Sequence, residues 1–107
     1  MLDYFRVEVE RRNGLAVVRA IGELDAAAKG QLTRAIEAAS AAHAVVIDLA
    51  GVTYFDAGGL RVLLRARDDA IARGSSFTIR SAPRPVRIVL ELAGQLDLLD
   101  DETEPAH

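Results

Sequence analysis

The chain has 107 residues, half of them hydrophobic and 27% charged, a composition typical of one soluble globular domain with its own core. A net charge of -3 and only five aromatic residues argue against nucleic-acid binding, and the lack of cysteine excludes disulfides, thiolate zinc sites and thiol nucleophiles. The N-terminus lacks the features of a signal peptide, and no apolar run could span a bilayer. We therefore expect a cytoplasmic protein.

The first third of the sequence predicts a hairpin followed by a helix. Residues 3–12 alternate between apolar and charged side chains, as in a half-exposed edge strand, and Asn13-Gly14 favours a tight turn into a second strand over residues 15–22. Asp25 is a typical helix N-cap, and five apolar residues then recur at helical spacing: Ala28, Leu32, Ala35, Ile36 and Ala39. We expect the two strands to pair antiparallel and the helix to cover them.

The remaining elements alternate strand and helix. A continuous apolar run over residues 44–49 predicts a central strand, and a helix follows from Asp56 to about Arg73, ended by Gly74. The buried stripe expected for this helix consists of Leu60, Leu63, Leu64, Ala70 and Ile71. Residues 77–81 predict another strand, residues 85–93 a helix with the stripe Val86, Val89, Leu90 and Ala93, and residues 95–100 a short strand or helix.

The order ββαβαβα, with a short final element, predicts an α/β fold of the whole chain. Strand-helix-strand connections join parallel neighbours, so we expect a mixed sheet with an antiparallel hairpin at one edge, covered by helices. Residues 1–100 would form a single domain, and the acidic tail 101–107 is expected to be disordered.

Three aspartates follow or end predicted strands, where α/β sheets often hold ligands: Asp25, Asp48 and Asp56. A phosphoacceptor or magnesium site is one interpretation. A receiver-type phosphoaspartate site also needs a nearby lysine, and the only lysine is Lys29 in the first helix. The simpler interpretation is that Asp25 and Asp56 cap helices and that Asp48 satisfies a turn.

Catalytic chemistry has little support. No GxxxxGK[ST] motif accompanies the strand that ends in Asp48, which argues strongly against a P-loop nucleoside triphosphatase. Neither His43 nor His107 has a serine or carboxylate at a spacing that indicates a triad. We predict no enzyme, no cofactor and no metal site.

Arg61 and Arg65 lie one turn apart near the start of the second helix. They either form a cationic patch that meets an acidic partner protein, or belong to a solvated face on which Arg65 pairs with Asp69.

Three segments, in this order and spacing, resemble one family. They are "GELDAAAKGQLTRAIEAA" at 22–39, "VVIDLAGVTYFDAGGLRVLLRA" at 45–66 and "RPVRIVLELAGQLDLL" at 84–99, and they resemble the STAS domains of bacterial anti-sigma-factor antagonists. The resemblance implies the STAS fold. It also implies that the protein binds an anti-sigma factor with a kinase-like ATPase fold and so releases the sigma factor that this partner holds. In the family, the kinase can phosphorylate the antagonist on serine or threonine.

The resemblance also assigns positions. Asp25 matches the aspartate of the family's GELD turn, and Asp56 the aspartate that begins the D-S-S-G-L or D-S-T-G-L turn, with the glycine and leucine of that turn at Gly59 and Leu60. Gly58 stands at the phosphoacceptor position and Ala57 at the position before it. The expected partner surface is therefore Asp25, Asp56, Ala57, Gly58, Gly59, Leu60, Arg61 and Arg65.

Gly58 has no oxygen to receive a phosphoryl group, so this residue cannot be the phosphoacceptor. Thr53, Ser75 and Ser76 are the nearest hydroxyls considered, and none occupies the helix start. Two other functions stay open at this point: an accessory subunit that docks on the ATPase of a lipid-transport ABC system, and a small-ligand sensor that holds an anion at the helix start.

Overall fold

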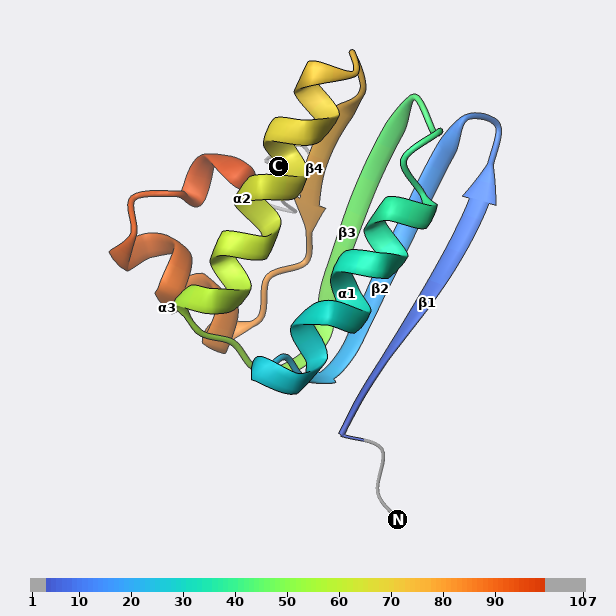
Figure 1. Cartoon of the computed structure of the whole chain (residues 1–107). Helices are drawn as coiled ribbons and strands as arrows, with labels where there is room; N and C mark the ends of the chain where they lie inside the picture. Colours follow the sequence, from blue (N-terminus) through green and yellow to red (C-terminus); the bar gives the residue numbers. More distant parts are fainter. Residues whose placement is uncertain (1–3, 100–107) are drawn as a thin grey trace, which may run out of the picture.

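A computed structural model describes residues 4–99 as a four-stranded sheet with two long helices over one face (Figure 1). The strands are β1 (Phe5–Arg12), β2 (Leu15–Glu23), β3 (Ala44–Tyr54) and β4 (Ser76–Arg80). The helices are α1 (Ala26–Ala38), α2 (Ala57–Ala72) and α3 (Arg84–Leu92), followed by a short 3-10 turn at Leu96–Leu98. The expected tail at 101–107 lies outside the described residues.

The sheet has the order β1-β2-β3-β4, with β1 and β2 antiparallel and the other two pairs parallel. Asn13 and Gly14 both have positive φ angles, 53° and 82°, so the hairpin turn has the conformation that the dipeptide predicts. The mixed sheet, the hairpin at one edge and the alternating order of elements are confirmed. The final segment forms a 3-10 turn and also a parallel bridge between Leu99 and Ile79.

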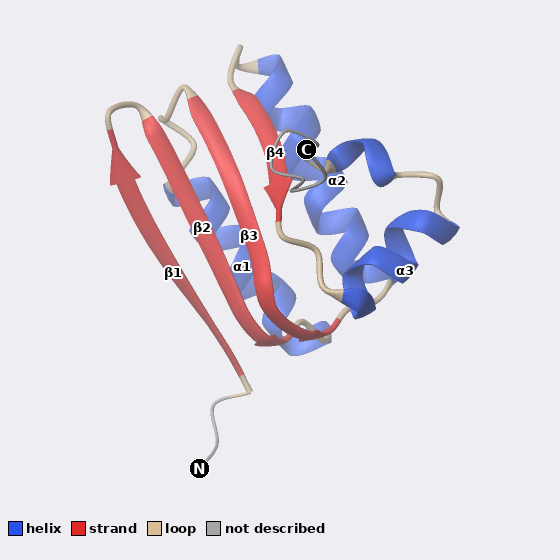
Figure 2. Ribbon diagram, turned by 180° about the vertical axis from the view of Figure 1, so that it is seen from behind, coloured by secondary structure: helices blue, strands red, loops and turns tan. Residues whose placement is uncertain are grey.

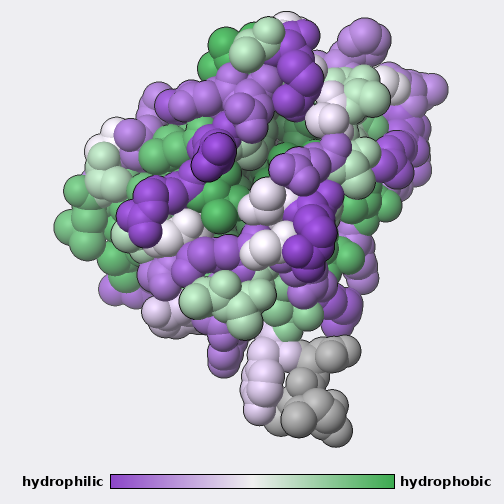
Figure 3. All heavy atoms as spheres, viewed as in Figure 1, coloured by the Kyte–Doolittle hydropathy of each residue, from purple (hydrophilic) through white to green (hydrophobic). Residues whose placement is uncertain are grey.

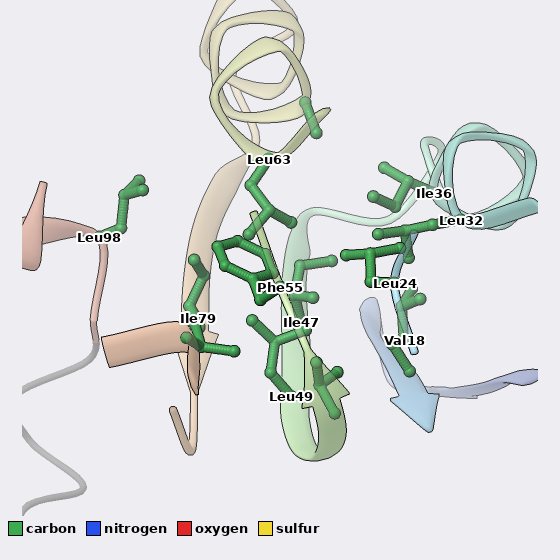
Figure 4. Close-up of a cluster of buried hydrophobic side chains, with 14 of the residues drawn as sticks. Val18, Leu24, Leu32, Ile36, Ile47, Leu49, Phe55, Leu63, Ile79 and Leu98 are labelled. Atoms are coloured by element: carbon green, nitrogen blue, oxygen red, sulfur yellow. The ribbon is translucent and has the colours of Figure 1, made fainter. Parts of the chain in front are cut away.

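Helices α1 and α2 cover the same face of the sheet, and α3 lies beside its β4 end (Figures 1 and 2). The core fills the space between these helices and the sheet, with Leu32 from α1, Leu63 from α2 and Ile47 from β3 fully buried (Figure 4). Each belongs to the apolar pattern that predicted its element. Burial of such side chains contributes about 1.5–3 kcal/mol each to folding.

Two residues of the expected helix stripes are exposed, whereas Leu64 and Val89 are partly buried against the core. Ile71 of α2 is 62% exposed, because α2 turns it away from the sheet between the buried Ala70 and the exposed Ala72. Ala93 is exposed as the C-cap residue of α3, where the helix has ended. The stripe of α1 is confirmed, with Ala28, Leu32, Ile36 and Ala39 buried and Ala35 packed against them.

Strand β3 is longer than the apolar run that predicted it. It continues to Tyr54, so Asp48 lies in the middle of the strand and not at its end. Because side chains alternate across a strand, Asp48 points away from the core residues Ile47 and Leu49, toward the face opposite α1 and α2. The three aspartates therefore do not converge, and residues 4–99 contain no cluster that could hold a metal ion.

Charged side chains form a row across the open face of all four strands, the face seen in Figure 2. Arg19 of β2 reaches Glu10 of β1 at 3.1 Å and Asp48 of β3 at 3.6 Å, and Arg80 of β4 reaches the same Asp48 oxygen at 3.3 Å. Opposite charges on neighbouring strands stabilise a sheet face that no helix covers.

Substituting Asp48→Asn is expected to lower the free energy of unfolding by about 1 kcal/mol, because the Asp48 side chain is only 14% exposed and two arginines lose their shared partner. Urea denaturation at low and high salt measures the loss, which should shrink as salt rises. Glu8→Gln is the control, because both side chains of the ion pair between Glu8 and Arg6 are exposed, so this pair contributes little to stability. Equal losses for the two variants would show that the shared aspartate has no special role.

Candidate functional site: a docking turn at the start of α2

Two helix starts lie together, just after the ends of the two central strands of the sheet. Strands β2 and β3 end side by side, with Glu23 opposite Tyr54, and the Leu24 amide donates a hydrogen bond to the Tyr54 carbonyl at 3.0 Å. Asp25 then caps α1 and Asp56 caps α2, through hydrogen bonds from Ala28 N at 3.1 Å and Gly59 N at 2.9 Å. Both capping predictions are confirmed. We call the segment from Tyr54 to Leu60 the docking turn.

The carboxylate of Asp56 has three partners. Its Oδ1 accepts from Gly59 N and lies 3.5 Å from Lys29 Nζ of α1, while its Oδ2 accepts from the Tyr54 hydroxyl at 3.3 Å. The backbone hydrogen bond from Gly59, helped by the Lys29 cation, holds the pKa of Asp56 below its usual range. The same carboxylate raises the pKa of the Tyr54 hydroxyl. Asp56 therefore stays ionised at neutral pH, and Tyr54 stays protonated.

The two glycines of the turn fit two different contacts. A Cβ at Gly58 would lie 2.5 Å from Lys29 Cε and 2.7 Å from Lys29 Nζ, so the missing side chain makes room for the lysine. A Cβ at Gly59 would lie 3.0 Å from the ring of Phe55 and 3.1 Å from Leu24, so this glycine allows α2 to approach the strand end. Neither glycine has a positive φ angle, and close packing accounts for both.

The eight residues of the expected partner surface divide into two groups. Asp25, Asp56 and Gly58 are partly exposed, and Ala57, Arg61 and Arg65 are exposed. Gly59 and Leu60 are buried, so they pack beneath the turn against the core and offer no surface to a partner. Arg65 and Asp69 form no ion pair, which overturns the pairing considered from their spacing.

Two residues at this turn were not among those predicted from the sequence. Tyr54 is 47% exposed, and Lys29 lies over Gly58 although 29 residues separate them. No local spacing indicates the second contact, because it depends on how α1 packs beside α2. The position of Lys29 in the first helix counted against an aspartate site that needs a nearby lysine, yet among residues 4–99 Lys29 is the cation that pairs with Asp56.

The cap and the charge of Asp56 can be separated by two substitutions. Asp56→Ala is expected to lower the free energy of unfolding by about 1 kcal/mol through the lost cap, whereas Asp56→Asn retains a capping oxygen and loses only the charge. Because the folded state lowers the pKa of Asp56, its charge contributes stability above the unfolded pKa, and that contribution disappears as pH falls through the folded pKa.

The check is urea denaturation from neutral pH to strongly acidic pH. We expect the stability gap between the wild type and Asp56→Asn to close at low pH. A gap that stayed constant over that range would show that the ionised carboxylate does not stabilise the turn.

The three hydroxyl residues named above all lie outside the start of α2. Thr53 belongs to β3 and Ser76 to β4, and Ser75 lies between α2 and β4, where its Oγ donates to the Ala42 carbonyl at 2.9 Å. No helix within residues 4–99 has the length and apolar character needed to cross a membrane.

Solved structures with the same fold are known. An anti-sigma factor antagonist from Mycobacterium paratuberculosis is 28% identical, with a TM-score of 0.78 over 94% of this chain and 83% of that one. The anti-sigma factor antagonist SpoIIAA in its unphosphorylated form is 20% identical, with a TM-score of 0.78 over 89% and 86%. The STAS domain of a SulP transporter from Vibrio cholerae is 21% identical, with a TM-score of 0.60 over 87% and 73%.

The family model of the STAS domain matches residues 6–106, nearly the whole chain. The mixed sheet and the order of its elements agree with the fold of the matched antagonist structures. The protein therefore belongs to the STAS domain family.

Proposed function

We propose that the protein is an anti-sigma-factor antagonist, which binds a kinase-type anti-sigma factor and thereby releases a sigma factor. The observation that carries this proposal is the joining of the two family turns, through the hydrogen bond from Leu24 N to the Tyr54 carbonyl. This bond joins the chain where β2 and β3 end, directly before the two capping carboxylates of Asp25 and Asp56. The 28% identical antagonist from Mycobacterium paratuberculosis supports the same assignment.

The chemistry of the docking turn suits binding better than catalysis. Asp56 already contacts a backbone amide, a lysine and a tyrosine hydroxyl, and these three contacts restrain the turn. A surface that is ordered before binding loses less conformational entropy when a partner docks. The half-exposed ring of Tyr54 adds the kind of side chain that is enriched in protein interfaces.

The usual phosphate switch is absent from the helix start. SpoIIAA occurs in a phosphorylated form, whereas Gly58 and Ala57 of this chain offer no hydroxyl. We propose that the kinase partner binds this protein and cannot inactivate it by phosphorylating the docking turn. Control would then lie in the supply of the protein, in its partner or in a ligand.

Binding to purified kinase-type anti-sigma factors encoded in the same genome tests the proposal, with calorimetry for the complex and a sigma-release assay for the outcome. Ala57→Arg places a long side chain on the exposed start of α2 and should abolish binding. Ala72→Arg makes the same change at the exposed far end of α2 and should leave binding intact. If no such kinase binds, or if both variants bind equally well, the assignment is wrong.

The two alternatives give different results in the same assay. Binding to an ABC ATPase in place of a kinase would support the transport accessory function, for which the SulP match shows only a shared fold. A small anion would have to replace the Asp56 carboxylate at the start of α2, where Lys29 also covers Gly58. The occupied helix start makes the sensor function the weaker alternative.

A further inference from the structure

A groove of about 520 Å³ lies between α1 and α2, on the side of the helices that faces away from the sheet. It begins beside Gly58 in the docking turn and follows the two helices, which run in the same direction (Figure 1). Its apolar lining is Ile36 of α1 with Val62 and Ala66 of α2. Figure 3 views this face and shows hydrophilic side chains over both helices, with less polar surface between them.

The charges along this groove are segregated by sign. Arg61 and Arg65 line the end near the docking turn, and Asp69 of α2 and Glu37 of α1 line the far end. Lys29 adds a third cation near the docking turn, although it is already paired with Asp56. The groove is therefore positive at one end and negative at the other.

Four of the five charged side chains that line the groove have no ion-pair partner among residues 4–99. They are Arg61, Arg65, Asp69 and Glu37. Arg65 and Asp69 are four residues apart on one helix, a spacing that commonly gives an ion pair. Both side chains instead remain available to an incoming molecule. This contrasts with the open face of the sheet, where Arg19, Arg80 and Asp48 are paired with one another.

We propose that this groove receives an amphipathic helix of the partner protein. Its acidic side chains would lie opposite Arg61 and Arg65, and a basic side chain opposite Asp69 and Glu37. Arg61, Arg65 and Asp69 occupy successive turns of α2, so a helix lying alongside matches them with charges at the same four-residue spacing. The narrow apolar lining accepts one or two apolar side chains between those charges.

This inference rests on the proposed function, because it describes a second contact of the protein that docks at the turn. A polypeptide fits better than a small anion, since the groove carries both signs of charge and opens along two helices. The charges are exposed, so they act mainly on partner choice and association rate, and high salt weakens their effect.

Two synthetic peptides, each stapled into a helix, test the proposal directly. The first carries Glu, Glu and Lys at four-residue intervals beside an apolar stripe, and the second carries Lys, Lys and Glu at the same places. Fluorescence anisotropy at low salt should show about tenfold tighter binding of the first peptide. Amide shifts in NMR spectra should map that binding to α1 and α2.

Charge reversal of the groove provides the decisive comparison. The triple variant Arg61→Glu, Arg65→Glu and Asp69→Arg should invert the preference and bind the second peptide more tightly. Arg73→Glu is the matched control, because Arg73 is exposed at the C-cap of α2 and does not line the groove. Thermal denaturation confirms that each variant is folded before binding is compared.

Equal binding of the two peptides, no inversion in the triple variant, or amide shifts away from α1 and α2 would overturn the inference. These results are separable from those for the proposed function. A kinase-type anti-sigma factor could bind a protein whose groove shows no charge preference, and the groove could show that preference although no such kinase binds.

Discussion

Gly58→Ser is expected to turn a protein that its kinase partner leaves unmodified into one that the kinase phosphorylates to completion. The substitution places a hydroxyl at the family's phosphoacceptor position, in the first turn of α2, and leaves the cap at Asp56 unchanged. Intact mass and peptide mapping after incubation with ATP measure the product. For the wild type we expect no phosphate on the peptide that contains residues 56–60.

The space around Gly58 predicts a second effect of the same substitution. The new Cβ would come within 2.5 Å of Lys29 Cε, so the flexible lysine side chain must move and its contact with Asp56 must loosen. Once phosphorylated, the new side chain places about two negative charges beside the Asp56 carboxylate. We expect the complex to weaken by at least about tenfold when ATP is present.

Ala57→Ser is the control for this prediction. It places a hydroxyl in the same turn, one residue before the phosphoacceptor position, on an exposed residue. The kinase should leave it unmodified and bind it as it binds the wild type. Phosphate on the wild-type turn, or equal phosphorylation of the two serine variants, would show that the residue at position 58 does not decide the switch.

The elements that local patterns specify could be predicted from the sequence. Asp25 and Asp56 could be predicted as helix caps because an aspartate before an apolar helical stripe can accept hydrogen bonds from the free amides of the first turn. The turn at Asn13-Gly14 follows from the backbone angles that its residue types favour. These features depend on residues within four positions of one another. Tertiary contacts have little power to change them.

The features that could not be predicted from the sequence depend on packing between distant segments. Strand β3 extends past its apolar run to Tyr54 because β2 pairs with it along this length, and the pairing moves Asp48 to mid-strand. The contact of Lys29 with Asp56 and Gly58 requires α1 and α2 to lie side by side. Both facts bear on the candidate site, so the fold could be predicted from sequence more fully than the site.

Gly22→Ala should cause the largest loss of stability among the substitutions considered, at least about 3 kcal/mol. Gly22 has a φ angle of 109°, which residues with a side chain rarely adopt. A Cβ there would overlap the carbonyl oxygen of Tyr4 and lie 2.8 Å from its carbonyl carbon. That oxygen accepts the hydrogen bond from Glu23 N at 2.7 Å, so backbone on both strands would have to shift.

Gly74→Ala is the matched control, because it separates backbone strain from steric overlap. Gly74 also has a positive φ angle, 80°, but a Cβ there would meet no atom within 4 Å. Its expected cost is about 1–2 kcal/mol from the backbone conformation alone. Urea denaturation of both variants measures the difference, and equal losses would show that the overlap with Tyr4 relaxes freely.

The consequence of Gly22→Ala for binding follows from its position. Gly22 stands three residues before Asp25, and the backbone shift needed near Tyr4 would move the end of β2, where Leu24 N bonds to the Tyr54 carbonyl. We therefore expect the variant to lose partner binding even at temperatures where it remains folded. Gly74→Ala, at the opposite end of α2, should bind normally when folded. Normal binding by folded Gly22→Ala would show that the two turns need not be held together to form the docking surface.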